Sequence, residues 1–129
     1  MISVLFVDNE PHFCELVKST LEQSGLFLVD TAESASAALG KMKHGSYDAI
    51  VSDYQMPDMN GIEFLKALRA SGNEIPFIIF TGKGREEVVI QAYENGADFY
   101  VQKSGDPEVQ YADLAQKITR AVGLHRAEH

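Results

Sequence analysis

Polar residues that could carry chemistry stand directly after short apolar runs of this sequence. Asp53 follows the run 49–51, whose β-branched residues are typical of a buried parallel strand. The other such residues are Asp8, Asn9 and Glu10 after the run 2–7, Thr81 and Gly82 at the end of the run 77–81, and Lys103 after the run 99–101. Since parallel strands end at one edge of an α/β sheet, we expect these side chains to share one site.

Together these residues provide what a phosphoryl-transfer site needs. Asp53 supplies a carboxylate, and an aspartate can accept a phosphoryl group covalently. Thr81 supplies a hydroxyl donor and Lys103 a cation. Catalysis of phosphoryl transfer depends mainly on positioning and on neutralising the charge of the transferring oxygens. Carboxylates gathered in one place favour a hard divalent cation, and Mg²⁺ suits a site built from oxygen ligands.

Alternating strand and helix patterns surround these residues and predict an α/β fold. The predicted strands cover residues 2–7, 27–29, 48–53, 77–81 and 99–101, and helical patterns follow at 11–21, 33–43, 62–68, 88–93 and 111–122. Short connections between such elements favour a parallel sheet with helices on both faces. A chain of 129 residues has room for one domain of this kind.

The composition narrows the classes of function. A net charge of −8 argues against a nucleic-acid surface, which needs a basic footprint. Cys14 is the single cysteine, which excludes an intrachain disulfide and indicates a reducing compartment and a small core residue. No apolar run has the length of a membrane span, and residues 1–10 lack the features of a signal peptide. We therefore expect a cytoplasmic protein that contacts no membrane.

One extended motif is specific enough to indicate a family. The run Asp53-x-x-Met56-Pro57-x-Met59-Asn60-Gly61, with the acidic segment, the Thr81-Gly82 pair and Lys103 in order at strand ends, resembles the receiver domain of two-component response regulators. The resemblance covers essentially the whole chain. It implies a flavodoxin-like doubly wound sheet of five parallel strands in the order 2-1-3-4-5, with five helices on its two faces.

The resemblance also implies an organisation of the chain and a lineage. Residues 1–124 would form the receiver domain, and residues 125–129 would be a C-terminal tail or the start of a linker or tag. The segment 103–107 is similar to receivers of archaeal regulators and kinases.

A phosphoacceptor and a metal site follow from the same resemblance. Asp53 would accept a phosphoryl group from a phosphohistidine of a sensor histidine kinase. Asp8, Asn9, Asp53 and the backbone carbonyl of Gln55 would hold Mg²⁺. The domain would be a signalling module that assists its own phosphorylation and dephosphorylation, and not an enzyme.

The remaining matched residues would read out the phosphorylated state. Thr81 would bond to a phosphoryl oxygen, Lys103 would pair with the phosphoryl group, and Tyr100 would turn inward as Thr81 moves. The supporting loop residues would be Glu10, Pro57, Gly61 and Gly82, with Gly82 small enough to let its loop approach the phosphoryl group. The surface of the fourth helix, fifth strand and fifth helix would then bind an effector domain or protein, or a second receiver.

Two departures from the family pattern leave alternatives open. Asn9 stands where the direct carboxylate ligand is expected, which predicts weaker Mg²⁺ binding and slower phosphorylation because an amide lacks charge. Ser104 follows Lys103 where the family usually has proline. Both keep open a degenerate receiver that binds proteins without phosphorylation. An aspartyl-phosphate phosphatase is a further alternative, but Gln55 stands where its second aspartate would be needed.

Overall fold

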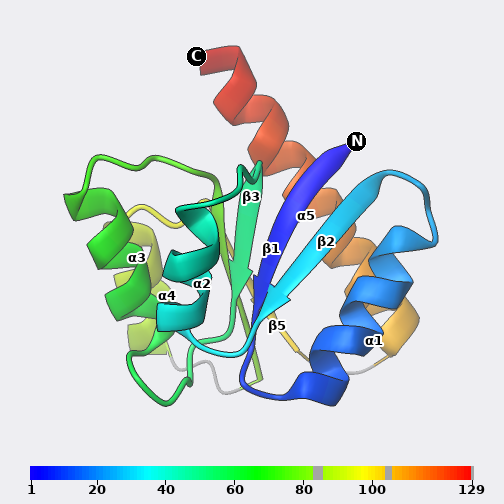
Figure 1. Ribbon diagram of the computed structural model, residues 1–129, viewed down its shortest axis with the longest axis horizontal. Coiled ribbons are helices and arrows are strands. Elements are labelled where there is room, and N and C mark those ends of the chain that lie inside the picture. The colour runs from blue at the N-terminus through cyan, green and yellow to red at the C-terminus, as the bar shows by residue number, and fades with distance from the viewer. Residues whose placement is uncertain (83–85, 104–105, 129) are drawn as a thin grey trace.

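Five parallel strands alternate with five helices in the computed structural model, which describes residues 1–82, 86–103 and 106–128 (Figure 1). The elements are β1 (Ile2–Val7), α1 (Pro11–Glu22), β2 (Phe27–Ala32), α2 (Ala35–Met42), β3 (Ala49–Ser52), α3 (Gly61–Ala70), β4 (Phe77–Thr81), α4 (Glu86–Glu94), β5 (Phe99–Gln102) and α5 (Pro107–Glu128). The strand order is β2-β1-β3-β4-β5. The predicted fold class and strand order are confirmed.

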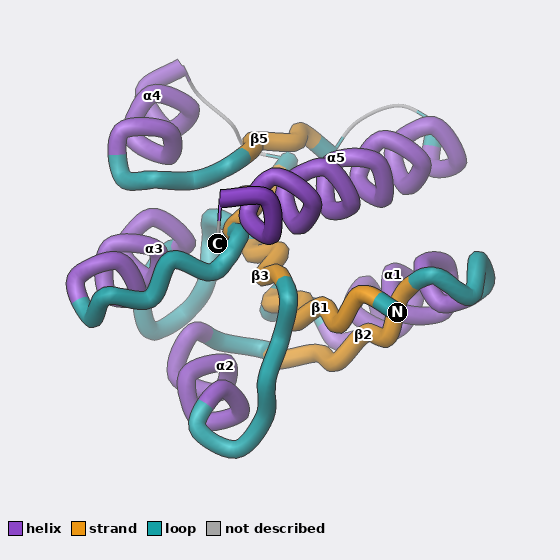
Figure 2. The backbone as a smooth tube through the Cα atoms, turned by 90° about the horizontal axis from the view of Figure 1, so that it is seen from above, coloured by secondary structure: helices purple, strands orange, loops and turns teal. Residues whose placement is uncertain are grey.

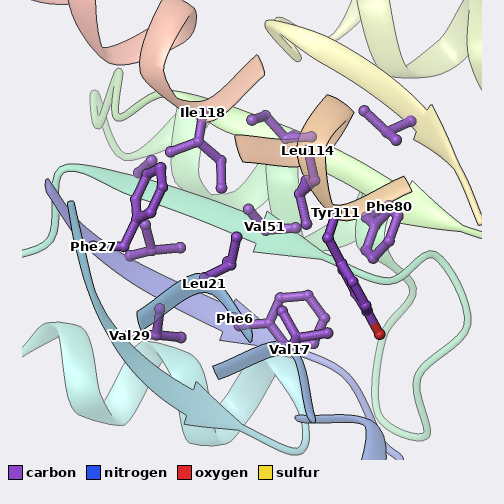
Figure 3. Close-up of a cluster of buried hydrophobic side chains, with 14 of the residues drawn as sticks. Phe6, Val17, Leu21, Phe27, Val29, Val51, Phe80, Tyr111, Leu114 and Ile118 are labelled. Atoms are coloured by element: carbon purple, nitrogen blue, oxygen red, sulfur yellow. The ribbon is translucent and has the colours of Figure 1, made fainter. Parts of the chain in front are cut away.

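The helices form two layers that enclose the sheet. Helices α1 and α5 cover one face, and α2, α3 and α4 cover the other (Figures 1 and 2). Alternation along a strand divides its side chains between the layers. In β1, Val4 and Phe6 join the cluster under α1 and α5 (Figure 3), whereas Leu5 and Val7 join the cluster on the opposite face. The central strands are therefore apolar on both faces, as their sequences indicate.

The boundaries of β2 and α5 differ from the prediction. Strand β2 continues through Asp30 and Thr31 to Ala32, beyond the predicted end at residue 29, because these residues keep the parallel register with β1. Helix α5 continues to Glu128, so residues 125–128 are helical. The division of the chain at residue 124 stays a prediction. In the described residues, no helix combines the length and the hydropathy needed to cross a lipid bilayer.

The carboxyl ends of all strands lie at one edge of the sheet, opposite the two chain termini (Figure 1). Backbone hydrogen bonds continue the pairing just past the strands. The Asp53 amide donates to the Val7 carbonyl at 2.8 Å, and the Lys103 amide donates to the Thr81 carbonyl at 3.0 Å. This pairing brings the predicted site residues of four strands to the same edge.

Candidate phosphoacceptor site

The centre of the site is a pair of buried aspartates that share one lysine. The side chain of Asp8 is 1% exposed and that of Asp53 is 12% exposed. Lys103 Nζ lies 2.8 Å from Asp8 Oδ2 and 3.8 Å from Asp53 Oδ2. One cation therefore faces two carboxylates, which leaves a local charge of −1 when all three groups are ionised. Such a site attracts a further cation.

Competing effects act on the Asp53 carboxyl group. Burial raises its pKa above the usual range, and the neighbouring Asp8 carboxylate raises it further. The Lys103 ammonium, a hydrogen bond from the Thr81 hydroxyl and one from the Tyr54 amide act in the opposite direction. Asp53 is thus a desolvated carboxyl group with donors already aimed at it, which is the arrangement expected of a nucleophile.

Aromatic rings position the Lys103 ammonium. Its Nζ lies 4.4 Å from the centre of the Phe13 ring and 5.6 Å from that of Phe80. The negative faces of aromatic rings stabilise a cation at these distances. Phe13 was not among the predicted site residues, and its place one turn after the acidic segment was the available signal. Cys14, next to it, is buried as predicted, and its Sγ donates to the Asp8 carbonyl at 3.2 Å.

Gly61 lies in close contact with the loop that follows Asp53. A Cβ atom built there would lie 2.5 Å from the backbone oxygen of Asp53 and 3.2 Å from Ile79 Cδ1. The Gly61 amide donates to the Tyr54 carbonyl at 2.7 Å, which closes the loop onto itself. Asn60 begins α3 with a capping box that includes Glu63. Gly61 therefore brings the start of α3 against the carboxyl end of β3.

Asp58 fixes the same loop to helix α2, a role that the sequence did not reveal. Its carboxylate accepts hydrogen bonds from the Ser36 hydroxyl and from the Ser36 amide at 2.8 Å. The Ser36 hydroxyl is the main cause of a lowering of the Asp58 pKa to about 2. The contact joins residues 22 positions apart, so the local sequence did not indicate it. Pro57, next to it, is exposed.

The predicted metal ligands form an oxygen donor set with few charges. Asn9, Glu10 and Gln55 are exposed, and the Glu10 amide donates to Asp8 Oδ1 at 3.0 Å. Glu10 is the N-cap residue of α1 and so belongs to the helix start. Within the described residues, no three His, Cys, Asp or Glu side chains are grouped to hold a metal ion. Two buried carboxylates remain, and this chemistry fits a hard cation that keeps water and carbonyl ligands.

Tyr100 and Gly82 lie beside this centre. The Tyr100 hydroxyl is buried without a hydrogen-bond partner among the described residues. Burial raises the pKa of Tyr100, and so does the negative charge of Asp53, which places the ring within electrostatic reach of the site. A Cβ at Gly82 would make ordinary contacts, at 3.7 Å from Lys103 Cβ, so packing here does not require glycine. Ser104 lies outside the described residues.

The fold and this centre together define a class of proteins. Residues 4–115 match the family model described as the response regulator receiver domain. The chain belongs to this family. The match begins within β1 and ends within α5, so it includes every residue of the site.

Curated relatives and solved structures agree with this assignment. The chain is 38% identical to response regulator Rre1 of Synechocystis over 121 residues, which are 92% of this chain and 52% of that protein. It is 34% identical to the transcriptional regulatory protein ResD of Bacillus subtilis, over 92% of this chain and 48% of the relative. The chain thus spans about half the length of these relatives.

Two solved structures show how far the likeness extends. A CheY-like receiver domain protein from Methanospirillum hungatei superposes with a TM-score of 0.88 at 26% identity, covering 100% of this chain and 99% of that one. The response regulator TrrA of Thermotoga maritima, solved in complex with Mg²⁺ and BeF, gives a TM-score of 0.80 at 30% identity. It covers 94% of this chain and 99% of that one.

Proposed function

We propose that this chain is a working phosphoacceptor receiver, in which Asp53 takes a phosphoryl group from the phosphohistidine of a sensor histidine kinase. The observation that carries the proposal is the shared contact of Lys103 with Asp8 and Asp53 at the buried strand ends. A relic of the fold has no need to bury two carboxylates at their desolvation cost. This argues against the degenerate receiver, and Gln55 in place of a second aspartate argues against the phosphatase.

The transfer step requires an ionised Asp53. A carboxylate oxygen of Asp53 forms a bond to phosphorus as the phosphorus–nitrogen bond of the phosphohistidine breaks, and the histidine nitrogen keeps the bonding electron pair. Lys103 and the Thr81 hydroxyl favour the ionised form, because both lower the pKa of Asp53 against the effect of burial. After transfer, Thr81 and Lys103 would face the new phosphoryl oxygens, since both already lie beside Asp53.

Asp8, Asn9, Asp53 and the Gln55 backbone carbonyl would hold Mg²⁺, which neutralises phosphoryl oxygens when it is bound. TrrA, which was solved with Mg²⁺, supports this choice of metal. Asn9 contributes an uncharged amide, so the affinity for Mg²⁺ is expected to be weak. The Asp8 carboxylate is fully buried, and its charge would be compensated both by the metal and by the Lys103 ammonium.

The output would pass through Tyr100 and the surface formed by α4, β5 and α5. Movement of Thr81 toward the phosphoryl group would favour the inward position of Tyr100. This is a local charge event that is read out by an element with two states. The partner would be an effector domain or protein, or a second receiver. The large uncovered share of Rre1 and ResD is consistent with an effector in those relatives.

Intact mass spectrometry tests this function most directly. The protein is treated with a small phosphodonor and Mg²⁺, as wild type, Asp53→Asn and Asn9→Asp. We expect the mass of one phosphoryl group, dependent on the metal, in the wild type and none in Asp53→Asn. Asn9→Asp should reach half-maximal labelling at about tenfold less Mg²⁺, as expected for an added charged ligand. No labelling of either the wild type or Asn9→Asp would reject the proposal and leave a protein-binding module.

A further inference from the structure

The Tyr100 ring packs against the apolar cluster on the α2, α3 and α4 face, but this inward position leaves its polar end unsatisfied. Its hydroxyl is buried and has no hydrogen-bond partner among the described residues. A buried, unpaired hydroxyl is unfavourable, because it has lost its bonds to water. Contacts elsewhere on Tyr100 must therefore help to hold the ring in place.

The Tyr100 backbone has such a contact at the outer edge of the sheet. Its amide donates to the hydroxyl of Tyr93 at 3.0 Å. Three residues further along, the Lys103 amide points the other way, to the Thr81 carbonyl of β4. The amide of Tyr100 thus belongs to the open side of β5, where no neighbouring strand can pair with it. A side chain of α4 takes the place of that strand.

The connection between α4 and β5 is already fixed to the body of the protein. Arg69 of α3 donates to the Gly96 carbonyl at 2.8 Å and lies 3.8 Å from Asp98. Asp98 in turn accepts from the Phe77 amide at 2.8 Å. Arg69 therefore holds the connection at Gly96 and Asp98. The Tyr93 hydroxyl adds a further attachment at Tyr100, two residues after Asp98.

Resting on the phosphoacceptor function above, we propose that Tyr93 is a positioning residue whose hydroxyl holds the Tyr100 backbone and so sets the inward position of the Tyr100 ring. Tyr93 is 48% exposed and Ile90 is 49% exposed. Residues three apart share one face of a helix. A partner protein that covers this face of α4 contacts the residue that holds Tyr100. If binding of that partner shifts the equilibrium between the inward and outward positions of Tyr100 by some factor, then that shift in Tyr100 changes the affinity for the partner by the same factor.

The substitution Tyr93→Phe removes the hydroxyl and keeps the ring. Nuclear magnetic resonance would follow amide exchange of Tyr100 and its ring resonances, without ligand and during titration with beryllium fluoride and Mg²⁺. Tyr47→Phe is the matched control, because the Tyr47 hydroxyl donates to Asp30 at the far edge of the sheet. We expect roughly fivefold faster exchange at Tyr100 in Tyr93→Phe, the ratio that one typical hydrogen bond gives. We also expect shifted Tyr100 ring resonances and a changed half-saturating concentration of beryllium fluoride.

Each outcome separates this proposal from the phosphoacceptor function. Tyr100 exchange and ring resonances that stay as in the wild type would overturn the role of Tyr93. So would faster exchange that affects Val29 of β2 equally, because it would mark general destabilisation. A specific change at Tyr100 in a protein that does not respond to beryllium fluoride in any variant would support the role of Tyr93 and overturn the phosphoacceptor function instead.

Discussion

The two edges of the sheet are held in different ways. At the β2 edge, charged side chains bond to the outward backbone groups, and at the β5 edge a neutral hydroxyl does so. The Val29 amide donates to Glu22 at 2.9 Å, and the Val29 carbonyl accepts from Lys18 at 2.6 Å. At Tyr100 the partner is the Tyr93 hydroxyl.

Strand register explains which groups of β2 need partners. Leu26 and Ala32 direct their carbonyls to β1, so Val29 and Thr31 direct theirs outward. The Thr31 amide donates to the Asp30 carboxylate at 2.9 Å, and its carbonyl accepts from Lys41 at 2.6 Å. All four outward polar groups of Val29 and Thr31 are therefore occupied, which closes this edge to the addition of another strand.

The weaker contacts at the β5 edge make it the edge that can move more easily. Charge-assisted hydrogen bonds are about twice as strong as neutral ones, so β2 is the more firmly held edge. The β5 edge carries Tyr100 and leads to Lys103, both of which contact or face the phosphoacceptor site. The edge that would respond to phosphorylation under the proposed function is the one with the weaker attachment.

A defect next to the central strand β3 should weaken both edges of the sheet alike. Gly61→Ala places a Cβ 2.5 Å from the Asp53 backbone oxygen, so the loop or helix α3 must shift. We expect a loss of about 2–3 kcal/mol in the free energy of unfolding, in the upper range for overpacking. Urea denaturation measures this loss, and amide exchange should accelerate alike at Val29 and Tyr100.

Gly123→Ala in α5 is the control for this substitution. A Cβ at Gly123 meets no atom within 4 Å, and alanine favours a helix. The control should raise the free energy of unfolding by roughly 0.5–1 kcal/mol. Equal stability of Gly61→Ala and wild type would show that the close contact at Asp53 is relieved at no cost.

Phosphorylation should act on one edge only. With a phosphodonor and Mg²⁺, amide exchange at Tyr100 should change by about tenfold, equivalent to ~1.4 kcal/mol, while Val29 and Thr31 change by less than about twofold. Hydrogen–deuterium exchange of the labelled protein measures both edges in one sample. Asp53→Asn should show neither change. A response of equal size at β2 would contradict the asymmetry of the edges.

Removal of the charged contacts should open the β2 edge. Lys18→Met with Lys41→Met leaves the carbonyls of Val29 and Thr31 without these donors. We expect a loss of about 1–2 kcal/mol in the free energy of unfolding, and self-association at high concentration, since an unprotected edge pairs with other strands. Denaturation and light scattering measure the two effects.

Lys117→Met provides the matched control for the edge variant. Lys117 pairs with Asp113 on the same helix and lies over the Phe99 ring of β5, at the opposite edge from β2. A monomeric edge variant with the stability of this control would show that water replaces the lysines without cost.

The smallest effect concerns the charge of Asp53 itself. Because its pKa in the folded protein is raised, the ionised carboxylate opposes folding at neutral pH. Asp53→Asn should therefore be slightly more stable than wild type at pH 7. The difference should shrink as the pH falls through the raised pKa toward the unfolded value of 3.8, because the carboxyl group then becomes neutral. Denaturation curves between pH 3.5 and 7.5 test this, with no pH-dependent gain as the contrary result.

Sequence reasoning placed the site well where it depended on strand ends. Asp8, Asp53, Thr81 and Lys103 lie at one edge as predicted, because the alternation of apolar runs and helical patterns specifies which residues end each strand. Strand β2 was predicted too short, because a charged residue such as Asp30 is typical of a loop. In the structure the Asp30 carboxylate accepts hydrogen bonds from Lys41, Tyr47 and the Thr31 amide.

The sequence by itself determined the order of elements and the residue types at the carboxyl ends of the strands. The pairing of Lys103 with Asp8, 95 positions apart, depends on the tertiary structure. The same holds for the hydrogen bonds between Asp58 and Ser36 and between the Tyr93 hydroxyl and the Tyr100 amide. Local periodicity reports which face of an element is buried. Contacts between elements depend on strand order and side-chain direction, which arise when the sheet and its two helical layers pack together.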